Sequence, residues 1–283
     1  MNTKAPATAQ RSILVTGASS GIGAWCARAL KTDGWRVFAT ARKHEDIAAL
    51  RADGIDALYL DYTKPASIEE LADEILGRTD GRLDALYNNG AYAQAGAVED
   101  VPVDALRYQF EANLFGWHDL TRRVIPAMRA QGHGRIVNCS SILGLVPAKF
   151  RGPYAASKHA LEALTLCMRM ELEGSGVHVS LIEPGPVESK IAANGLPWFE
   201  RNIDWEQSVH RDAYLPQLER LRSGGTKSRL KRKPDAVYEV LKHALESPRP
   251  RPHYVVTIPA KIGVTLKRLL PASMFYQVMS RQG

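Results

Sequence analysis

The chain has few of the features that mark disulfide-rich or metal-binding proteins. It has only three cysteines among 283 residues, Cys26, Cys139 and Cys167, and no two are close enough for a CxxC pair. No group of histidine with cysteine or glutamate has the sequence spacing of metal ligands. We therefore expect reduced, buried thiols, a cytoplasmic protein and no metal site.

Long apolar runs are also absent. No run approaches the roughly 20 residues that span a bilayer, and the first residues lack the apolar stretch of a signal peptide. We expect residues 1–11 to form a loose tail. The formal charge of +7 favours anionic partners without choosing among nucleic acid, a membrane surface and a phosphorylated cofactor.

Two patterns alternate along the chain. Helical periodicity fills the longer segments, for example 104–131 and 154–173. Between them lie short runs rich in β-formers, several of them apolar throughout: 12–16, 35–40, 56–60, 83–87, 135–140, 177–183 and 254–258. This alternation predicts a single doubly wound α/β domain over 12–260, in which about seven parallel strands are covered by helices on both faces.

Two later segments differ from this pattern. Residues 184–233 have no clear strand and are rich in proline, glycine and large apolar residues, so we interpret them as a substrate lid inserted in the same domain. Residues 261–283 form a C-terminal extension. Part of it, 261–279, mixes apolar and basic residues and could cover the pocket, contact a partner subunit or touch a membrane. We favour the first two, because Pro271 interrupts any long amphipathic helix.

A glycine-rich segment follows the first expected strand. The sequence "TGASSGIG" occupies 16–23, and a helix is expected to begin near Ser20. Gly17 permits a tight turn, and Gly21 and Gly23 allow close approach of the backbone to a ligand. The free N–H groups at the start of the helix favour an anion. In this position a pyrophosphate site is preferred over a plain turn.

Arg42 follows the second expected strand. An NAD enzyme usually has an acidic residue there for the ribose hydroxyls, whereas this chain has Ala41, Arg42 and Lys43. A guanidinium can bind a 2′-phosphate through two charge-assisted hydrogen bonds. We therefore expect NADP(H) to be preferred and NAD(H) to remain possible. The alternative is that Arg42 is a solvated loop residue.

The stretch "YAASK" places Tyr154 and Lys158 one helical turn apart, with small residues between them. A free tyrosine has a pKa near 10, and an ammonium nearby lowers it. Tyr154 could then give a proton to a carbonyl oxygen or take one from an alcohol. A Tyr and a Lys at this spacing also occur at the start of ordinary amphipathic helices.

Together, "TGASSGIG", "NNGA" at 88–91, Ser141 and "YAASK" resemble the short-chain dehydrogenase/reductase family over roughly residues 12–190. The resemblance implies a Rossmann-like fold and an NAD(P)-dependent enzyme that acts on CH–OH groups. It is closest to the NADP-preferring members with hydroxysteroid, retinol or aldehyde substrates. The catalytic residues that it implies are Asn113, Ser141, Tyr154 and Lys158. Ser140 is the rival of Ser141, which the family spacing favours.

The resemblance also implies cofactor contacts at the following positions: Gly17, Ser19, Ser20, Gly21, Ile22, Gly23, Arg42, Asp61, Asn88, Gly90, Tyr154, Lys158, Pro184, Gly185, Val187 and Ser189. Three positions depart from the commoner family pattern. Tyr62 replaces valine, "NNGA" replaces Asn-Asn-Ala-Gly, and Ser189 replaces threonine. The second change puts the local geometry of that loop in doubt.

Large apolar residues are concentrated in two segments near the expected site. They are Leu143, Leu145, Val146 and Phe150 before Tyr154, and Ile191, Leu196, Trp198, Phe199 and Trp205 in the lid. They predict a lipophilic carbonyl or alcohol as substrate. The alternative is that half of them belong to the core.

We therefore expect an NADP(H)-dependent oxidoreductase that interconverts a carbonyl and an alcohol. A catalytically silent dinucleotide sensor is the alternative, but it predicts loss of the serine, tyrosine or lysine, and all three are present. The basic segment 226–233 could bind nucleic acid, but no aromatic residues are interleaved with it. A solvated basic loop near the anionic cofactor is the simpler interpretation. A homodimer or homotetramer through 104–131 and 154–173 is expected from the family.

Overall fold

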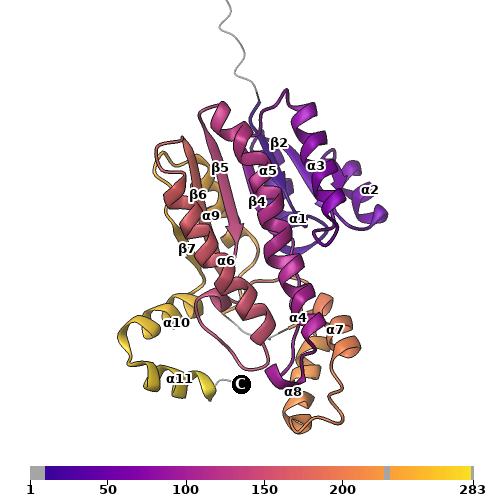
Figure 1. The fold of residues 1–283 in the computed structure, drawn as a ribbon, viewed down its shortest axis with the longest axis vertical. Coiled ribbons are helices and arrows are strands. Elements are labelled where there is room, and N and C mark those ends of the chain that lie inside the picture. Colours follow the sequence, from indigo (N-terminus) through magenta and orange to yellow (C-terminus); the bar gives the residue numbers. More distant parts are fainter. Residues whose placement is uncertain (1–9, 226–229, 282–283) are drawn as a thin grey trace, which may run out of the picture.

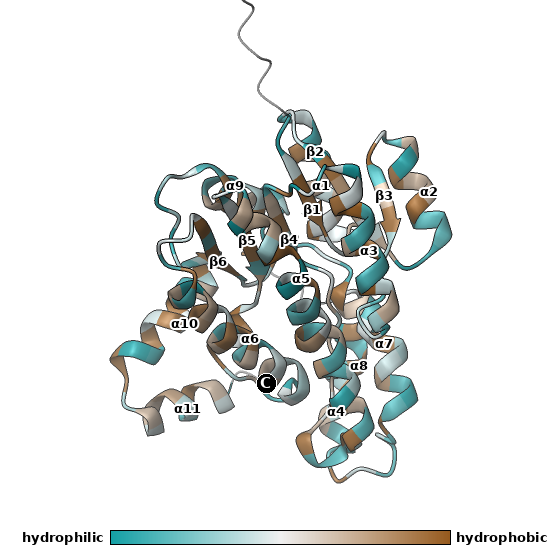
Figure 2. Cartoon of the chain, turned by 45° about the horizontal axis from the view of Figure 1, so that its top comes forward, coloured by the Kyte–Doolittle hydropathy of each residue, from teal (hydrophilic) through white to brown (hydrophobic). Residues whose placement is uncertain are grey.

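Seven parallel strands form one twisted sheet, as the alternating pattern predicts. The structure is a computed structural model that describes residues 10–225 and 230–281, and the sheet order is β3-β2-β1-β4-β5-β6-β7. The strands are β1 (Ser12–Val15), β2 (Arg36–Ala41), β3 (Asp56–Tyr59), β4 (Ala85–Asn88), β5 (Gly134–Cys139), β6 (Val177–Pro184) and β7 (His253–Val256). They are mostly apolar and buried, and Figure 2 shows them as brown bands between the helices.

Helices cover both faces of the sheet (Figure 1). One face carries α1 (Gly21–Thr32) and α9 (Asp235–Glu246), and α2 (His44–Ala52) lies beside β2 and β3. The other face carries α3 (Pro65–Arg78), α5 (Gly116–Ala130) and α6 (Gly152–Glu171). Apolar residues of both layers pack against the strands in one core, so the predicted fold class is confirmed.

The long helix expected over 104–131 is divided in the structure. It consists of α4 (Val103–Phe110), a π-helical turn over Glu111–Phe115 and α5. Asn113 lies in the π turn and is fully buried. Its Nδ2 donates to the carbonyl of Tyr92 at 2.9 Å, and its Oδ1 accepts from the Tyr92 amide at 3.2 Å. The wide turn thus directs a polar side chain into the protein, as π turns at functional sites often do.

The segment after β6 builds a second, smaller core. It contains α7 (Ile191–Asn202) and α8 (Arg211–Arg222), and it packs on residues 95–101, which include the short helix Val98–Asp100. Tyr214 joins the two parts, because its hydroxyl donates to Asp100 at 2.6 Å and accepts from the Ala97 amide at 2.7 Å. Pro184 still pairs with Val256 at the end of β6, and beyond it the only extended pairing in the described part of 184–233 is a bridge between Val187 and Arg232. The role of this segment as a lid stays a prediction.

The C-terminal extension forms α10 (Ile258–Leu269) and α11 (Ala272–Ser280), at the same end of the molecule as α7 and α8 (Figure 1). Lys267 on α10 donates to the carbonyl of Leu145, so this helix covers the loop after β5. No helix in the described chain has the length and apolarity needed to cross a bilayer. The expectation of buried thiols is wrong for Cys167, which is exposed on α6, whereas Cys26 and Cys139 are buried. The expected tail falls mostly on residues outside the described ones.

Candidate active site

The site lies at the carboxyl edge of the sheet, where the strand order reverses. β1 pairs with both β2 and β4, so the chain leaves β1 toward one side and leaves β4 toward the other. Loops that part in this way leave a crevice, which is where open α/β sheets bind ligands. The glycine segment after β1 and the "NNGA" segment after β4 face each other at this point.

These two loops are in backbone contact. A Cβ added to Gly17 would lie 2.3 Å from the Cα of Gly90, and Gly17 has φ +63°. Asn89, which sequence analysis did not single out, joins them by donating from Nδ2 to the carbonyls of Thr16 and Gly17 at 3.1 and 3.3 Å. A Cβ on Gly23 would be 2.4 Å from the Gly17 carbonyl oxygen. The glycines are therefore required for the packing of these loops.

The start of α1 is suited to an anion. Ser20 is the N-cap residue, but its side chain makes no capping hydrogen bond, so the first N–H groups of the helix are free of that partner. In the same segment Ser19 is exposed, and Ser20 and Ile22 are half-buried. Gly21 faces Ser189, since a Cβ added to Gly21 would lie 3.3 Å from the Ser189 Cα. The structure thus brings together two expected cofactor contacts that are far apart in the sequence, Gly21 and Ser189.

The turn after β6 closes the other side of the crevice. Pro184 ends the strand, and Gly185 packs against α10, where an added Cβ would lie 2.3 Å from Thr257 Oγ1. Val187 is buried and pairs with Arg232. The segment therefore holds a fixed backbone course along the crevice.

Three expected cofactor contacts have different surroundings. Arg42 is exposed directly after β2, and no hydrogen bond or ion pair is recorded for it within the described chain. Asp61 is half-buried and accepts hydrogen bonds from the Thr63 amide and hydroxyl.

The side chain of Asn88 lies in the core. It accepts from Tyr62 Oη at 3.0 Å and donates to Thr121 Oγ1 at 3.0 Å and Asn138 Oδ1 at 2.9 Å. Its carboxamide is therefore used to hold β4 against its neighbours, because a fully buried amide needs partners inside the protein.

Tyr154, Lys158 and Ser141 come together at the same edge of the sheet as the glycine segment. Tyr154 is on the first turn of α6, and Ser141 follows β5 and starts the short helix Ile142–Gly144. Lys158 is completely buried. Its Nζ donates to the carbonyl of Cys139 at 2.8 Å and lies 4.2 Å from the centre of the Trp117 ring, so it is held by a carbonyl and a cation–π contact.

The electrostatics of this group differ from the sequence-based expectation. Burial raises the pKa of Tyr154, and the Ser141 hydroxyl is the group that lowers it by a hydrogen bond. Lys158 Nζ lies 5.8 Å from the centre of the Tyr154 ring. The same burial lowers the pKa of Lys158 to about 8. The expected lowering of the Tyr154 pKa by Lys158 is therefore not seen in this structure, because burial raises that pKa.

Asn113 approaches this group from the π turn. Its Nδ2 lies 3.5 Å from Ser157 Oγ, and Ser157 is on α6 between Tyr154 and Lys158. The Ser157 hydroxyl donates to the carbonyl of Tyr154 at 2.8 Å. The four expected catalytic residues are thus contributed by three elements that meet at one place.

Some of the residues expected to line an apolar pocket lie in or against a core instead. Phe199 is fully buried in the second core, and Phe150, Leu196 and Trp205 pack against that core. Core packing explains these residues, so the prediction is wrong for Phe199. Val146 is buried as well. Leu143, Leu145 and Ile191 are half-buried, and Trp198 stacks on Tyr108 with ring centres 4.5 Å apart.

A cluster that sequence reasoning missed lies behind Lys158. Glu162, Glu183 and His253 bring their ligand atoms within 4.8 Å of one another. They come from α6, β6 and β7, so no spacing along the chain could reveal them. The observation that no histidine and glutamate group has ligand spacing holds along the sequence, whereas the fold brings these three residues together in space.

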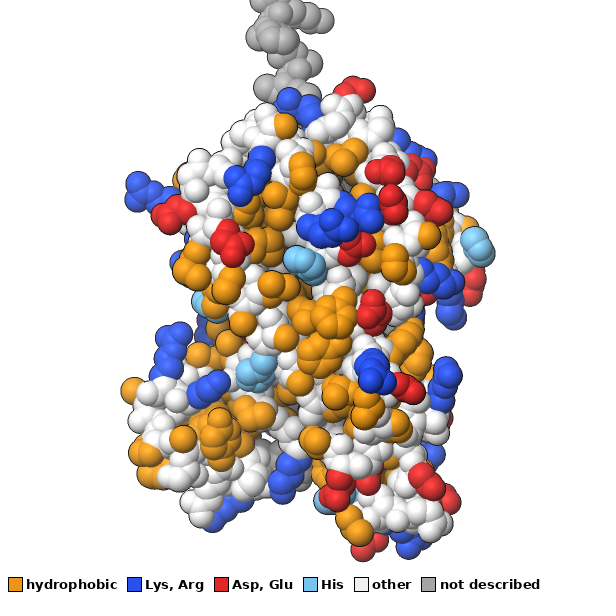
Figure 3. Space-filling model, in the orientation of Figure 1, with side chains coloured by type: hydrophobic (Ala, Val, Ile, Leu, Met, Phe, Trp, Pro, Cys, Tyr) orange, Lys and Arg blue, Asp and Glu red, His pale blue; other side chains and the backbone are white. Residues whose placement is uncertain are grey.

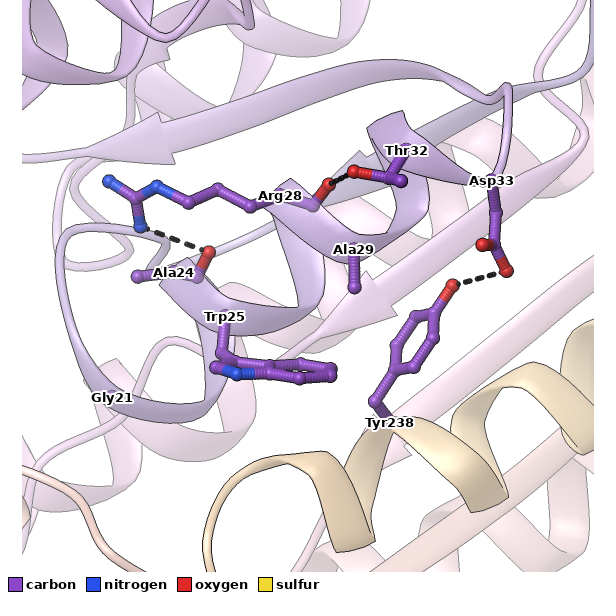
Figure 4. Close-up of a pocket in the computed structure, with 8 residues that line it drawn as sticks. All are labelled: Gly21, Ala24, Trp25, Arg28, Ala29, Thr32, Asp33 and Tyr238. Atoms are coloured by element: carbon purple, nitrogen blue, oxygen red, sulfur yellow. Dashed lines mark hydrogen bonds between the residues drawn. The ribbon is translucent and has the colours of Figure 1, made fainter.

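A separate hollow lies between α1 and α9, on the face of the sheet opposite α6 (Figure 4). Trp25 and Tyr238 form its walls, with ring centres 5.2 Å apart, and Tyr238 donates to Asp33 at 2.7 Å. Gly21, at the start of α1, lines this hollow as well as the glycine segment, whereas Tyr154 lies on α6 at the other face of the sheet.

Comparison with known proteins places this geometry in a family. Residues 11–198 match the model of the short chain dehydrogenases. The oxidoreductase YbbO of Escherichia coli (strain K12) is 37% identical over 270 residues, which are 95% of this chain and 94% of that protein. The chain therefore belongs to the short-chain dehydrogenase family and is an oxidoreductase.

Solved structures show the same fold. The actinorhodin polyketide ketoreductase, solved with NADPH, is 29% identical with a TM-score of 0.70, covering 87% of this chain and 95% of that one. A short-chain dehydrogenase/reductase from Burkholderia phymatum, solved with NAD, is 25% identical with a TM-score of 0.75, covering 92% of this chain and 93% of that one.

Proposed function

We propose that the protein interconverts a carbonyl and an alcohol on a lipophilic substrate with NADP(H), and that Tyr154 is the general acid and base. One observation carries the proposal. The Ser141 hydroxyl interacts with the Tyr154 phenol, and Lys158 follows one turn later, at the edge of the sheet where the glycine segment lies.

The residues present fit a nicotinamide dinucleotide. The loop over Ser19–Gly23 and the uncapped start of α1 would hold the pyrophosphate. Ser189 lies against Gly21, and the Pro184–Val187 turn would border the nicotinamide, whose ribose hydroxyls Lys158 would hold. When bound, the reduced nicotinamide supplies a hydride to the carbonyl carbon.

The chain itself handles the proton. Ser141 would donate a hydrogen bond to the substrate oxygen and stabilise the negative charge that develops there. In reduction, Tyr154 Oη would give its proton to the same oxygen, and in oxidation it would take the proton back. Because Tyr154 is buried, the phenol is the stable form and suits the role of proton donor. Asn113 would support a water that connects Lys158 to solvent.

Two observations bear on the cofactor and the substrate. Arg42 stands after β2 where an acid would select NAD, which supports NADP(H). Relatives of this fold have been solved with either cofactor. The half-buried Leu143 and Leu145, which follow Ser141, and Trp198, whose ring centre lies 5.1 Å from that of Tyr92, support an apolar substrate.

The alternative of a silent dinucleotide sensor is not favoured. It would not need the serine, tyrosine and lysine to meet at one place, and here they do so with a fully buried lysine. Burying an ammonium is costly unless it has a function or good partners.

Turnover by a tyrosine variant tests the proposal. We expect NADPH oxidation with some members of a panel of lipophilic aldehydes and ketones, and a loss of about 10²–10⁴-fold in kcat in Tyr154→Phe, the range for one acid-base group. The exposed Tyr59 is a matched control, and Tyr59→Phe should keep the activity. Intact NADPH binding without turnover of any substrate would favour the sensor instead.

A further inference from the structure

The buried cluster behind Lys158 is aligned with the catalytic residues. Tyr154, Lys158 and Glu162 recur every four residues on α6, so they lie along one face of the helix. Glu162 is only 5% exposed and Glu183 is fully buried. His253, on the edge strand β7, completes the cluster and is the member nearest to solvent, with 33% of its side chain exposed.

Glu183 and His253 satisfy each other. His253 Nδ1 lies 2.5 Å from Glu183 Oε1, and the Tyr254 amide donates to Glu183 Oε2 at 2.9 Å. Glu162 is placed differently, since its Oε2 is 3.7 Å from His253 Nδ1, which is an ion-pair distance without a hydrogen bond. The cluster therefore contains one carboxylate with hydrogen-bond partners, Glu183, and one without hydrogen-bond partners in the described chain, Glu162.

Three buried oxygens here have no hydrogen-bond partner in the described chain: both carboxylate oxygens of Glu162 and Ser140 Oγ. Ser140 is 4% exposed and faces Glu162 closely enough to lower the pKa of that carboxyl. Both side chains converge on Gly144, where an added Cβ would lie 2.6 Å from Ser140 Oγ and 3.0 Å from Glu162 Oε1. A proton on Glu162 would remove a poorly paired buried charge and provide a donor for Ser140.

The charges around Glu162 support the same conclusion. Burial, and then the charge of Glu183, raise the pKa of Glu162 to about 7, whereas His253 and Lys158 act in the opposite direction. Burial lowers the pKa of Lys158 to about 8, and Glu162 opposes that shift. Two groups that titrate close together and interact will affect each other's protonation.

The remaining titratable groups near the cluster are His253, Arg268 and Cys139. The hydrogen bond to Glu183 raises the pKa of His253, and Arg268 on α10 lowers it. Cys139, at the end of β5, is buried with a raised pKa and is therefore a neutral thiol near neutrality. Because the Cys139 thiol is neutral, Glu162 is the charged group that raises the pKa of Lys158.

We propose that Glu162, Glu183 and His253 form a proton-binding site that controls the charge of Lys158, and through it the pH range in which Tyr154 transfers its proton. When Glu162 is ionised, its negative charge lies one helical turn from the Lys158 ammonium and favours the charged form of the lysine. When Glu162 is protonated, that negative charge is absent. His253 connects the site with solvent. Only the last step, from Lys158 to Tyr154, rests on the proposed function. Glu162 is a positioning residue that acts through Lys158.

A divalent metal is a weaker explanation of the same residues. His253 Nδ1 is already engaged with Glu183, and the nearby ammonium of Lys158 opposes a second cation. A proton needs no rearrangement of these groups. Metal analysis of the purified protein is nevertheless one outcome of the test.

The first measurement needs neither cofactor nor turnover. Lysine side chains labelled for NMR would be titrated, with the Lys158 signal assigned by its loss in Lys158→Arg. We expect the pKa of Lys158 to fall by about one unit in Glu162→Gln, the low end for one opposite charge, and to recover in part in Glu162→Asp. Glu171→Gln, an exposed position on the same helix, is the control and should change nothing.

The second measurement is the pH profile of kcat/KM for carbonyl reduction. The alkaline limb of the profile should move about one pH unit lower in Glu162→Gln, in step with Lys158. If the wild type turns over no carbonyl, the proposed function fails and the NMR titration still decides the inference. If the wild type turns over a carbonyl, but Glu162→Gln changes neither the alkaline limb nor the Lys158 titration, this inference fails and the proposed function stands. A stoichiometric metal that is lost in Glu162→Gln would also overturn it.

Thermal stability gives a third readout and shows whether the variants fold. Folded Glu162 binds its proton more tightly than the unfolded chain does, so stability should fall as pH rises from the ordinary 4.5 through about 7. Glu162→Gln lacks this loss, and its Tm relative to the wild type should rise across that window. A difference in Tm between Glu162→Gln and the wild type that stays constant across this pH window would contradict the proposal. If Glu162→Gln does not fold, His253→Gln should move the alkaline limb in the same direction, because it removes a charge that keeps Glu162 ionised.

Discussion

Arg42 is the residue on which the proposed preference for NADP(H) rests. It is exposed directly after β2, its neighbour Ala41 is buried at the end of that strand, and neither presents the carboxylate that would bond two ribose hydroxyls. The guanidinium is therefore free to meet a 2′-phosphate in the crevice between β1 and β4. Lys43, which follows it, lies 3.9 Å from Glu45 and is partly neutralised, so Arg42 carries the larger share of the attraction.

Removal of Arg42 should change cofactor preference and little else. A hydrogen bond to a charged group contributes about 1.5–3 kcal/mol, so the ratio of kcat/KM for NADPH over NADH should fall about 10- to 100-fold in Arg42→Ala. The ratio from steady-state kinetics with both cofactors is the measurement. Arg82→Ala, an exposed site before β4 at the opposite edge of the sheet, should leave the ratio as it is. An unchanged ratio in Arg42→Ala would show that Arg42 is only a solvated loop residue.

The π turn between α4 and α5 shows how one element serves both structure and chemistry. Asn113 and Gln109 are both fully buried and both bond the loop around Tyr92. Gln109 donates to the Tyr92 carbonyl at 3.0 Å and accepts from the Gln94 amide at 2.7 Å. Only Asn113 also approaches α6, at Ser157. Gln109 therefore supports only the loop around Tyr92, whereas Asn113 supports both that loop and the site.

Truncation of each should destabilise the protein, but only one should impair catalysis. Either alanine variant leaves buried backbone groups unpaired, which costs about 1–3 kcal/mol, so thermal denaturation should show a similar drop in Tm for both. At a temperature where both variants are folded, kcat should fall at least tenfold more in Asn113→Ala than in Gln109→Ala. Equal effects on kcat would assign Asn113 to loop support alone.

Regular elements were predictable because their signals are local. Each expected strand lies within a few residues of an observed one, since burial on both faces favours apolar runs such as Ile13, Leu14 and Val15 of β1. The π turn was not predictable, because it depends on the pairing of Asn113 with Tyr92 across 21 residues. The glutamate and histidine cluster was hidden for the same reason. Phe199 was misplaced because an apolar residue looks the same in a pocket wall and in a core.

At the scale of the whole molecule, the outer faces of α5 and α6 are the natural place for a partner subunit. Figure 3 shows apolar side chains gathered on this face where α4 leads into α5. Large apolar residues are exposed along it, among them Phe115 at 51%, Leu164 at 37% and Met170 at 67%. Exposed apolar groups gathered on one face mark an association surface more often than chance. In Figure 1 the C-terminal helices α10 and α11 lie beside and below the lower end of α6, so they leave the part of this face over α5 open.

We expect the wild type to have two or four times the mass of one chain in light scattering, and the double variant Phe115→Glu/Leu164→Glu to be a monomer. The reason is that an unpaired charge buried in an interface costs several kcal/mol, while the same glutamates are well solvated on a free chain. Val209→Glu is the matched control, because Val209 is 86% exposed on the loop between α7 and α8, away from α5 and α6. A monomeric wild type, or a folded double variant that keeps the wild-type mass, would show that these helices are not the interface. A change of mass in Val209→Glu would move the interface to the α7–α8 end of the molecule.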